Sequence, residues 1–194
     1  MIRGVLALGA AALACCFPPA AHAVDAAHAA EAPAAAEARM RDCLTAAAAA
    51  HRLPPAVLVI LLKVEGGSLG RVSRNSNGTV DIGPLQVNTV WVPRIAAHWS
   101  AAPATAFLAL RDNLCANLEG GAWILRQAMD EAHGDFWGGV GIYHSHNPDY
   151  KARYLRQVLK ATLQLQAQAR RSPDAAGASE PASGDAPRRL AARE

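Results

Sequence analysis

Between residues 39 and 169 the apolar and polar positions of the chain follow the pattern of helices packed on a core. The clearest case is Tyr150, Tyr154 and Val158, which recur every four positions and share one face of a helix. Prolines in first turns and glycines after last turns mark further helix ends. The predicted helices cover residues 40–51, 56–65, 89–99 with a break at Pro93, 115–132 and 136–143, and a last one begins at Asn147. The pattern predicts an all-α domain.

The helix predicted over residues 56–65 contains an uninterrupted apolar run. Such a run is compatible with a buried helix or with a buried strand. Pro54 and Pro55 favour a helix, because a proline in the first turn loses no hydrogen bond. A helix that is apolar on all sides is expected to lie at the centre of the core. Gly66 is expected to end it.

From residue 68 to residue 88 the chain is polar and rich in glycine, serine and asparagine, which predicts a long loop. Loops of this length in compact domains are often functional. A Gly-Pro turn precedes Gln86 and Asn88, whose amide groups could hydrogen-bond sugar hydroxyls. Trp91 follows the loop directly, so it is the tryptophan best placed to lie against a sugar ring.

Residues 1–23 have the pattern of a cleavable signal peptide. Arg3 precedes a short apolar run, and an Ala-His-Ala sequence ending at Ala23 matches a cleavage site. The run is short for a membrane span. An uncleaved anchor and a lipoprotein modified at Cys15 or Cys16 are the alternatives. We expect an exported, periplasmic protein.

The segments that flank the domain lack the residues of a core. Residues 24–38 are alanine-rich and predict a linker, or a helix without a core face. Residues 170–194 are rich in Ser, Pro, Gly and Ala and predict a disordered tail. The chain of 194 residues therefore holds a single domain, which we expect to be monomeric. Its net charge of +3 is too small to indicate a nucleic-acid partner.

Removal of the signal peptide leaves Cys43 and Cys115 of the four cysteines. In an oxidising compartment two cysteines predict one disulfide, with two separate buried thiols as the alternative. Two cysteines are too few for a zinc site, and His144 and His146 have no further matched ligands nearby in the sequence. We therefore expect no metal and no cofactor.

Glu65 is the candidate catalytic residue. It ends an apolar helix, so burial and the negative end of the helix dipole both disfavour its carboxylate form. A carboxyl that stays protonated near neutral pH can act as a general acid on a glycosidic bond. The alternative is a solvated surface group, which is common for a glutamate at a helix end.

Three segments occur in an order that resembles the family 1 lytic transglycosylases, the SLT-domain proteins. The family pattern is Glu-Ser, then Gly-Leu-Met-Gln, then Ala-Tyr-Asn; here residues 65–66, 83–86 and 142–144 match it. The resemblance covers about residues 40–160. It implies a goose-type lysozyme-like fold with one disulfide.

Within that family the chain is most similar to the branch associated with conjugation, type IV secretion and related envelope machines. That branch has an early cysteine, an Asp-x-Gly-x-x-Gln-x-Asn loop, and a cysteine before an Asn-x-x-x-Gly-Ala-Trp-Ile-Leu helix. Cys43, residues 81–88 and residues 115–125 match these features. The resemblance implies local opening of the cell wall for a conjugation, secretion or pilus apparatus.

The resemblance also implies a mechanism. Glu65 protonates the glycosidic oxygen between N-acetylmuramic acid and N-acetylglucosamine, and then takes the proton of the muramyl C6 hydroxyl as that oxygen attacks C1. The product has a 1,6-anhydromuramyl end, and one carboxylate is sufficient. Gln86 and Tyr143 would bind the glycan strand and orient Glu65, with Asn88 assisting.

The chain departs from the family pattern at three positions. Gly66 replaces the serine that helps to position the glutamate, a role that Ser68 or Ser73 could take. We also expect Ser73 to be one of the substrate-binding residues. Pro84 replaces a leucine and His144 an asparagine.

Two rival functions stay open. One is a hydrolytic muramidase with Asp81 as a second carboxylate that holds a water molecule. The other is a non-catalytic periplasmic assembly or peptidoglycan-binding protein, which the glycine at position 66 makes conceivable.

Overall fold

A computed structural model describes residues 22–171 of the protein. The predicted signal peptide over residues 1–23 and the predicted tail over residues 170–194 lie outside the described residues, apart from the two positions of each that belong to terminal helices. The chain divides into two compact units, Met1–Arg39 and Met40–Glu194. Helix α1 (His22–Ala50) crosses this division.

The described part of the first unit is helical. Residues 24–38, predicted as a linker or as a helix without a core face, belong to α1, and residues 33–37 of it are exposed. Among the described residues no single helix has the length and apolar character to cross a membrane, although Pro33–Ala50 and Pro55–Glu65 together pass that test as a pair bent by 118°.

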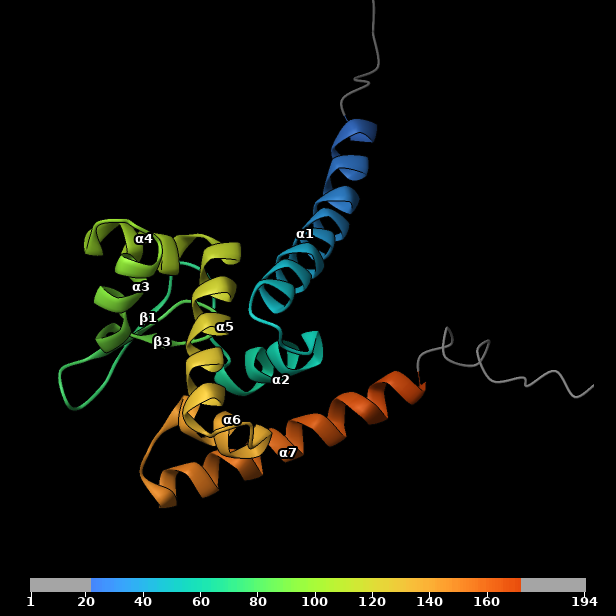
Figure 1. The fold of residues 1–194 in the computed structure, drawn as a ribbon. Coiled ribbons are helices and arrows are strands. Elements are labelled where there is room, and N and C mark those ends of the chain that lie inside the picture. The colour runs from blue at the N-terminus through green and yellow to red at the C-terminus, as the bar shows by residue number, and fades with distance from the viewer. Residues whose placement is uncertain (1–21, 172–194) are drawn as a thin grey trace, which may run out of the picture. The chain divides into compact units, whose positions relative to one another are not determined.

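The second unit is mostly helical (Figure 1). After the end of α1 its helices are α2 (Pro55–Glu65), the 3-10 turn η1 (Thr89–Trp91), α3 (Val92–His98), α4 (Pro103–Asp112), α5 (Leu114–Glu131), α6 (Phe136–His144) and α7 (Pro148–Arg171). The predicted helices are confirmed to within a few residues, except that the first begins at His22 and not at residue 40. Asn147 caps α7, because its side-chain oxygen accepts hydrogen bonds from the backbone N–H groups of Asp149 and Tyr150. Helix α4 was not predicted. The break predicted at Pro93 corresponds to the change from η1 to α3 directly before it, and Pro93 lies in the first turn of α3.

The all-α prediction is wrong for the polar segment at residues 68–88, which contains a small antiparallel sheet. Strands β1 (Val72–Arg74), β2 (Val80–Ile82) and β3 (Val87–Asn88) pair in the order β1-β2-β3. Each strand has two or three residues. Strands this short are held by their neighbours and carry too few positions to show an alternating pattern. The register sets Asp81 opposite both Ser73 and Asn88.

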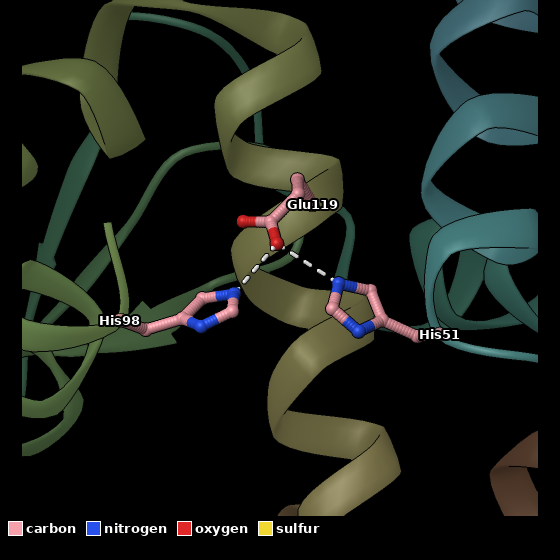
Figure 2. A group of neighbouring side chains, drawn as sticks. All are labelled: His51, His98 and Glu119. Carbon is pink, nitrogen blue, oxygen red and sulfur yellow. Dashed lines mark hydrogen bonds and ion pairs between the residues drawn. The ribbon is translucent and has the colours of Figure 1, made fainter. Parts of the chain in front are cut away.

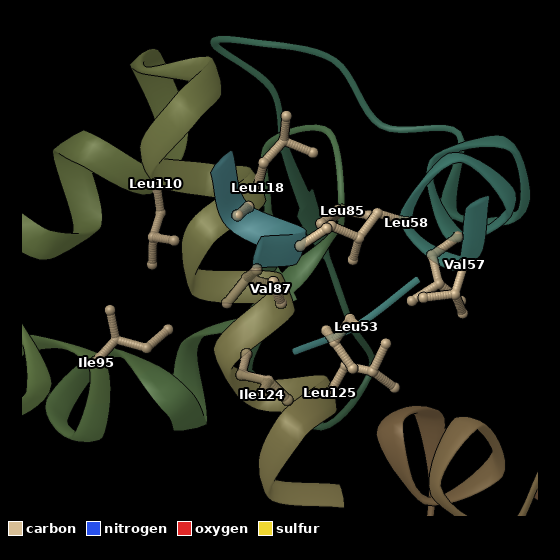
Figure 3. Close-up of a cluster of buried hydrophobic side chains, with 14 of the residues drawn as sticks. Leu53, Val57, Leu58, Leu85, Val87, Ile95, Leu110, Leu118, Ile124 and Leu125 are labelled. Carbon is tan, nitrogen blue, oxygen red and sulfur yellow. The ribbon is translucent and has the colours of Figure 1, made fainter. Parts of the chain in front are cut away.

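The hydrophobic core surrounds α5 (Figure 3). Leu118 and Leu125 of α5, Leu58 of α2 and Leu110 of α4 are all fully buried. Helix α5 packs against α4 and α6, and α7 packs against α2 and α6. The expectation that α2 is buried on all sides is too strong, since Val59 is 38% exposed.

The predicted disulfide is present and joins Cys43 of α1 to Cys115 of α5. The two residues are 72 positions apart in the sequence, and their Cα atoms are 4.9 Å apart. By closing so long a loop, the bond stabilises the fold by about 4 kcal/mol through the entropy of the unfolded chain.

Candidate active site

A polar cleft of about 370 Å³ opens between the end of α2, the small sheet, η1 and α6. Of the residues singled out from the sequence, it is lined by Glu65, Asp81, Gln86, Asn88, Trp91 and Tyr143. These positions span most of the second unit, so the fold brings together three sequence segments that are far apart. Asn75, Asn77, Thr79 and His144 add further polar groups to the wall.

Glu65 is the last residue of α2 and is half-buried in this cleft. Gly66 ends the helix in the left-handed conformation, with φ of 61°, and donates its N–H to the carbonyl of Leu62. The pKa of the Glu65 carboxyl is raised from 4.5 to about 7: burial is the largest cause, the hydrogen bond from Tyr154 acts in the opposite direction, and the nearby charge of Asp81 adds to the rise. A carboxyl with this pKa is substantially protonated at neutral pH, which a general acid requires.

Tyr154 of α7 holds Glu65 in place. Its hydroxyl donates a hydrogen bond to Glu65 Oε1 at 2.6 Å, across 89 positions of sequence. The tyrosine is 2% exposed, and the ring of His144 stacks on it at 4.3 Å. Burial, and then the charge of Glu65, raise the pKa of its phenol, so Tyr154 stays a hydrogen-bond donor. The sequence indicated Tyr154 only as a core residue, and the one further signal was that a buried tyrosine hydroxyl needs a partner.

The turn at residues 83–86 comes close to Glu65 because Gly67 has no side chain. A Cβ atom on Gly67 would lie 2.1 Å from the carbonyl oxygen of Gly83 and 2.6 Å from Gln86 Nε2. Gln86 Nε2 donates to the Gly83 carbonyl at 2.7 Å, and Gln86 itself has a positive φ of 48°. The segment after α2 and the Gln86 turn are therefore in direct contact, and this contact sets Gln86 beside the glutamate.

Asn117 of α5 holds the same turn from the core side. It is fully buried, and its Oδ1 accepts the N–H of Leu85 at 2.8 Å. Its Nδ2 donates to the carbonyls of Ile82 at 3.0 Å and Leu110 at 2.9 Å. A Cβ on Gly83 would lie 2.4 Å from this nitrogen, so the glycine is required for the approach. The sequence showed Asn117 as part of a family motif and assigned it no role.

Asp81 also lines the cleft and lies within a network of amides. Its two carboxylate oxygens accept hydrogen bonds from Asn88 at 2.7 Å and from Asn75 at 3.0 Å. The same two amide nitrogens donate to the hydroxyl of Thr79. Asn88 also caps η1 by accepting the N–H of Val90. Asp81 is thus held rigidly, and its charge acts on Glu65 across the cleft.

Tyr143 and Trp91 complete the cleft. The hydroxyl of Tyr143 donates to the carbonyl of Leu85 at 3.3 Å, and burial raises the pKa of its phenol well above the ordinary value. Trp91 meets Trp123 edge to face at 6.2 Å and carries the guanidinium of Arg94 over its ring at 4.5 Å. Both aromatic side chains are therefore fixed by neighbours while they line the cleft.

Ser73 is not among the residues that line the cleft; it lies on β1, opposite Asp81. Among the described residues, the side-chain hydrogen bond to Glu65 comes from Tyr154 and not from Ser68 or Ser73. His144 and His146, which alternate in the sequence, also have different partners. His144 stacks on Tyr154, whereas His146 pairs with Glu131 on the surface at 2.8 Å.

Comparison with protein-family models and with curated proteins found no match to this chain. A function for the cleft has to be argued from its own residues.

Proposed function

We propose that this protein is a peptidoglycan lytic transglycosylase. The observation that carries the proposal is Glu65, a cleft carboxyl with a pKa raised to about 7 and an orientation set by Tyr154. A second support is that Gln86 and Tyr143, which come from the other two family-like segments, line the same cleft. A site of this kind fits cleavage of a glycosidic bond by a carboxyl that is protonated at the start.

The reaction uses Glu65 twice. Tyr154 occupies Oε1, so Oε2 carries the proton that passes to the glycosidic oxygen between N-acetylmuramic acid and N-acetylglucosamine. As that bond breaks, the C6 hydroxyl of the muramyl residue attacks C1 and gives its proton to the Glu65 carboxylate. The carboxyl is thereby regenerated, no water is consumed, and the product ends in a 1,6-anhydro sugar.

The walls of the cleft fit a chain of acetamido sugars. Amide and hydroxyl groups of Gln86, Asn88 and Asn77 can exchange hydrogen bonds with sugar hydroxyls and acetamido groups. Trp91 offers an aromatic surface of the kind on which the apolar face of a sugar ring packs. The volume of about 370 Å³ lies within the range of ordinary ligand sites.

The test is mass analysis of muropeptides released from purified peptidoglycan by the wild type and by Glu65→Gln. We expect 1,6-anhydromuramyl ends from the wild type and none from the variant. Glu131→Gln is the matched control, because it makes the same chemical change at an exposed helix end outside the cleft. Absence of cleavage by a folded wild-type protein, or unchanged cleavage by Glu65→Gln, would refute the proposal and favour a wall-binding protein.

A hydrolytic muramidase is the second candidate, and the observation in its favour is that Asp81 lines the same cleft as Glu65. Asp81 could hold a water molecule for attack at C1, as the second carboxyl of inverting glycosidases does. The two reactions differ in product: hydrolysis leaves reducing ends. For a transglycosylase, Asp81→Asn should change the pH dependence of the reaction more than it changes the product. For a hydrolase, the same substitution removes a catalytic group.

We further propose that the enzyme acts in the periplasm, on glycan strands next to an envelope-spanning conjugation, secretion or pilus apparatus. This rests on the N-terminal sequence and on the family branch that the chain resembles. Cell fractionation tests the location. Loss of transfer or secretion in a Glu65→Gln strain tests the partner, and an isolated gene with no such apparatus encoded nearby would count against it.

A further inference from the structure

A second cluster of titratable side chains lies outside the cleft and is formed by His51, His98 and Glu119. His51 follows the end of α1, His98 is the last residue of α3, and Glu119 is in the middle of α5. Figure 2 shows both imidazole rings turned toward the glutamate from opposite sides. Nε2 of His51 is 2.9 Å and Nε2 of His98 is 3.1 Å from the same oxygen, Glu119 Oε1. The three potential ligand atoms, one from each residue, all lie within 4.8 Å of one another.

We propose that this cluster binds a divalent transition-metal ion, with Zn²⁺ as the ion that its ligands suit best. Two imidazole nitrogens and one carboxylate oxygen form a common protein ligand set for zinc, with a fourth position left for water. Bonds of about 2.0–2.1 Å in a tetrahedral site separate neighbouring ligand atoms by about 3.3 Å. The observed 2.9 Å and 3.1 Å are within a few tenths of an ångström of that value.

The surroundings orient the ligands as an outer shell does. Trp99 Nε1 donates to the other oxygen, Glu119 Oε2, at 2.5 Å, so that Oε1 is the oxygen presented to the two imidazoles. The ring of His98 stacks on Trp123 at 4.9 Å with an interplanar angle of 18°. Partners of this kind fix ligand orientation and raise metal affinity.

Charge and access are also suitable. With both imidazoles neutral the cluster has the single negative charge of Glu119, which a dication would more than balance. The His98 side chain is 35% exposed and that of Glu119 is 28% exposed, so an ion can enter, whereas His51 is only 10% exposed. The site is thus partly enclosed and partly open to solvent.

The position of the cluster indicates what the ion does. Cys115 precedes Glu119 by one turn of α5, and its disulfide already ties α5 to α1. The ion would join Glu119 of α5 to His51, which directly follows α1, and to His98 of α3. Because η1 with Trp91 leads directly into α3, the ion braces the wall of the cleft. The proposed ion therefore braces helices against one another, and this proposal does not depend on the proposed activity.

The test is calorimetric titration of Zn²⁺ into the full chain, prepared without a histidine tag and freed of metal with a chelator. We expect one ion per chain. Glu119→Gln and His98→Asn each remove a ligand and should weaken binding more than about 100-fold, since loss of an outer-shell partner alone costs about 10–100-fold. His146→Asn is the matched control, because His146 pairs with a glutamate but belongs to no group of three potential ligands among residues 22–171. The zinc affinity of this variant should equal that of the wild type.

Thermal unfolding with and without Zn²⁺ gives a second readout. A ligand that binds the folded state raises the midpoint, so zinc should raise that of the wild type and leave that of Glu119→Gln unchanged. His98→Asn decides the matter if Glu119→Gln does not fold, because the His98 side chain is partly exposed. No zinc binding by the wild type, or binding that survives both ligand variants, overturns the proposal.

Discussion

Two glutamates at helical positions of this protein have opposite surroundings. Glu65 ends α2 with one hydrogen-bond donor, Tyr154, and with the like charge of Asp81 nearby. Glu119 in the middle of α5 accepts hydrogen bonds from three nitrogens, those of His51, His98 and Trp99. Burial and a negative neighbour both favour the protonated form of a carboxyl, and Glu65 has both. We propose that the same residue type serves proton transfer at one site and cation binding at the other.

The largest effect expected is loss of catalysis in Glu65→Gln. In the proposed reaction one carboxyl serves as acid and then as base, so we expect turnover to fall by about 10³-fold or more, within the range for general acid–base groups. Release of soluble muropeptides measures it, with Glu131→Gln as the control. A variant that keeps a tenth of wild-type turnover would show that Glu65 is not the reacting group.

The same variant should be more stable than the wild type at high pH. The folded-state pKa of Glu65, about 7, lies above the 4.5 of the unfolded chain. Protonation therefore stabilises the fold fully below 4.5, and this contribution is lost as pH rises through about 7. The two values correspond to about 3 kcal/mol. Glutamine has no charge, so we expect Glu65→Gln to gain up to about this amount above pH 7.

Urea unfolding of Glu65→Gln and wild type, below pH 4.5 and above pH 7, measures this difference. The two proteins should have equal free energies of unfolding at the lower pH and diverge at the higher one. A constant difference across the range would mean that Glu65 is not buried as a raised-pKa carboxyl.

Tyr154→Phe should have an intermediate effect, by removing the donor that orients Glu65. A hydrogen bond to a charged or acidic group is worth about 1.5–3 kcal/mol, so turnover should fall about 10- to 100-fold. The bond lowers the pKa of Glu65, and its loss should move the alkaline limb of the pH–rate profile to higher pH. A fall in rate with an unmoved limb would assign Tyr154 to packing alone.

The smallest effect concerns the other glutamate. Trp99→Phe keeps an aromatic ring but removes the N–H that holds Glu119 Oε2. We expect Zn²⁺ affinity to fall about tenfold, the lower end of outer-shell effects. Turnover on peptidoglycan should change less than it does in Tyr154→Phe. Calorimetric titration of zinc into Trp99→Phe and into Tyr154→Phe compares the two sites directly. An unchanged zinc affinity in Trp99→Phe would show that Trp99 does not orient Glu119.

Local patterns were sufficient for most helices. Proline starts and glycine stops at Pro55 and Gly66, and the cap at Asn147, act within one turn of chain, so they can be read without knowing the fold. The missed helix α4 has no side-chain cap and contains several alanines, which leaves little periodic signal. The missed strands pair across turns and are too short to show alternation.

The sequence by itself determined the order of Glu65, Gln86 and Tyr143, the pair of cysteines available for a disulfide, and the helices that carry them. Only the tertiary structure decided which groups surround each glutamate. Tyr154 reaches Glu65 across 89 positions, and His51 reaches Glu119 across 68. No local sequence period predicts either contact, because both form when helices distant in sequence pack together. The pKa of one carboxyl and the ligand set of the other are consequences of that packing.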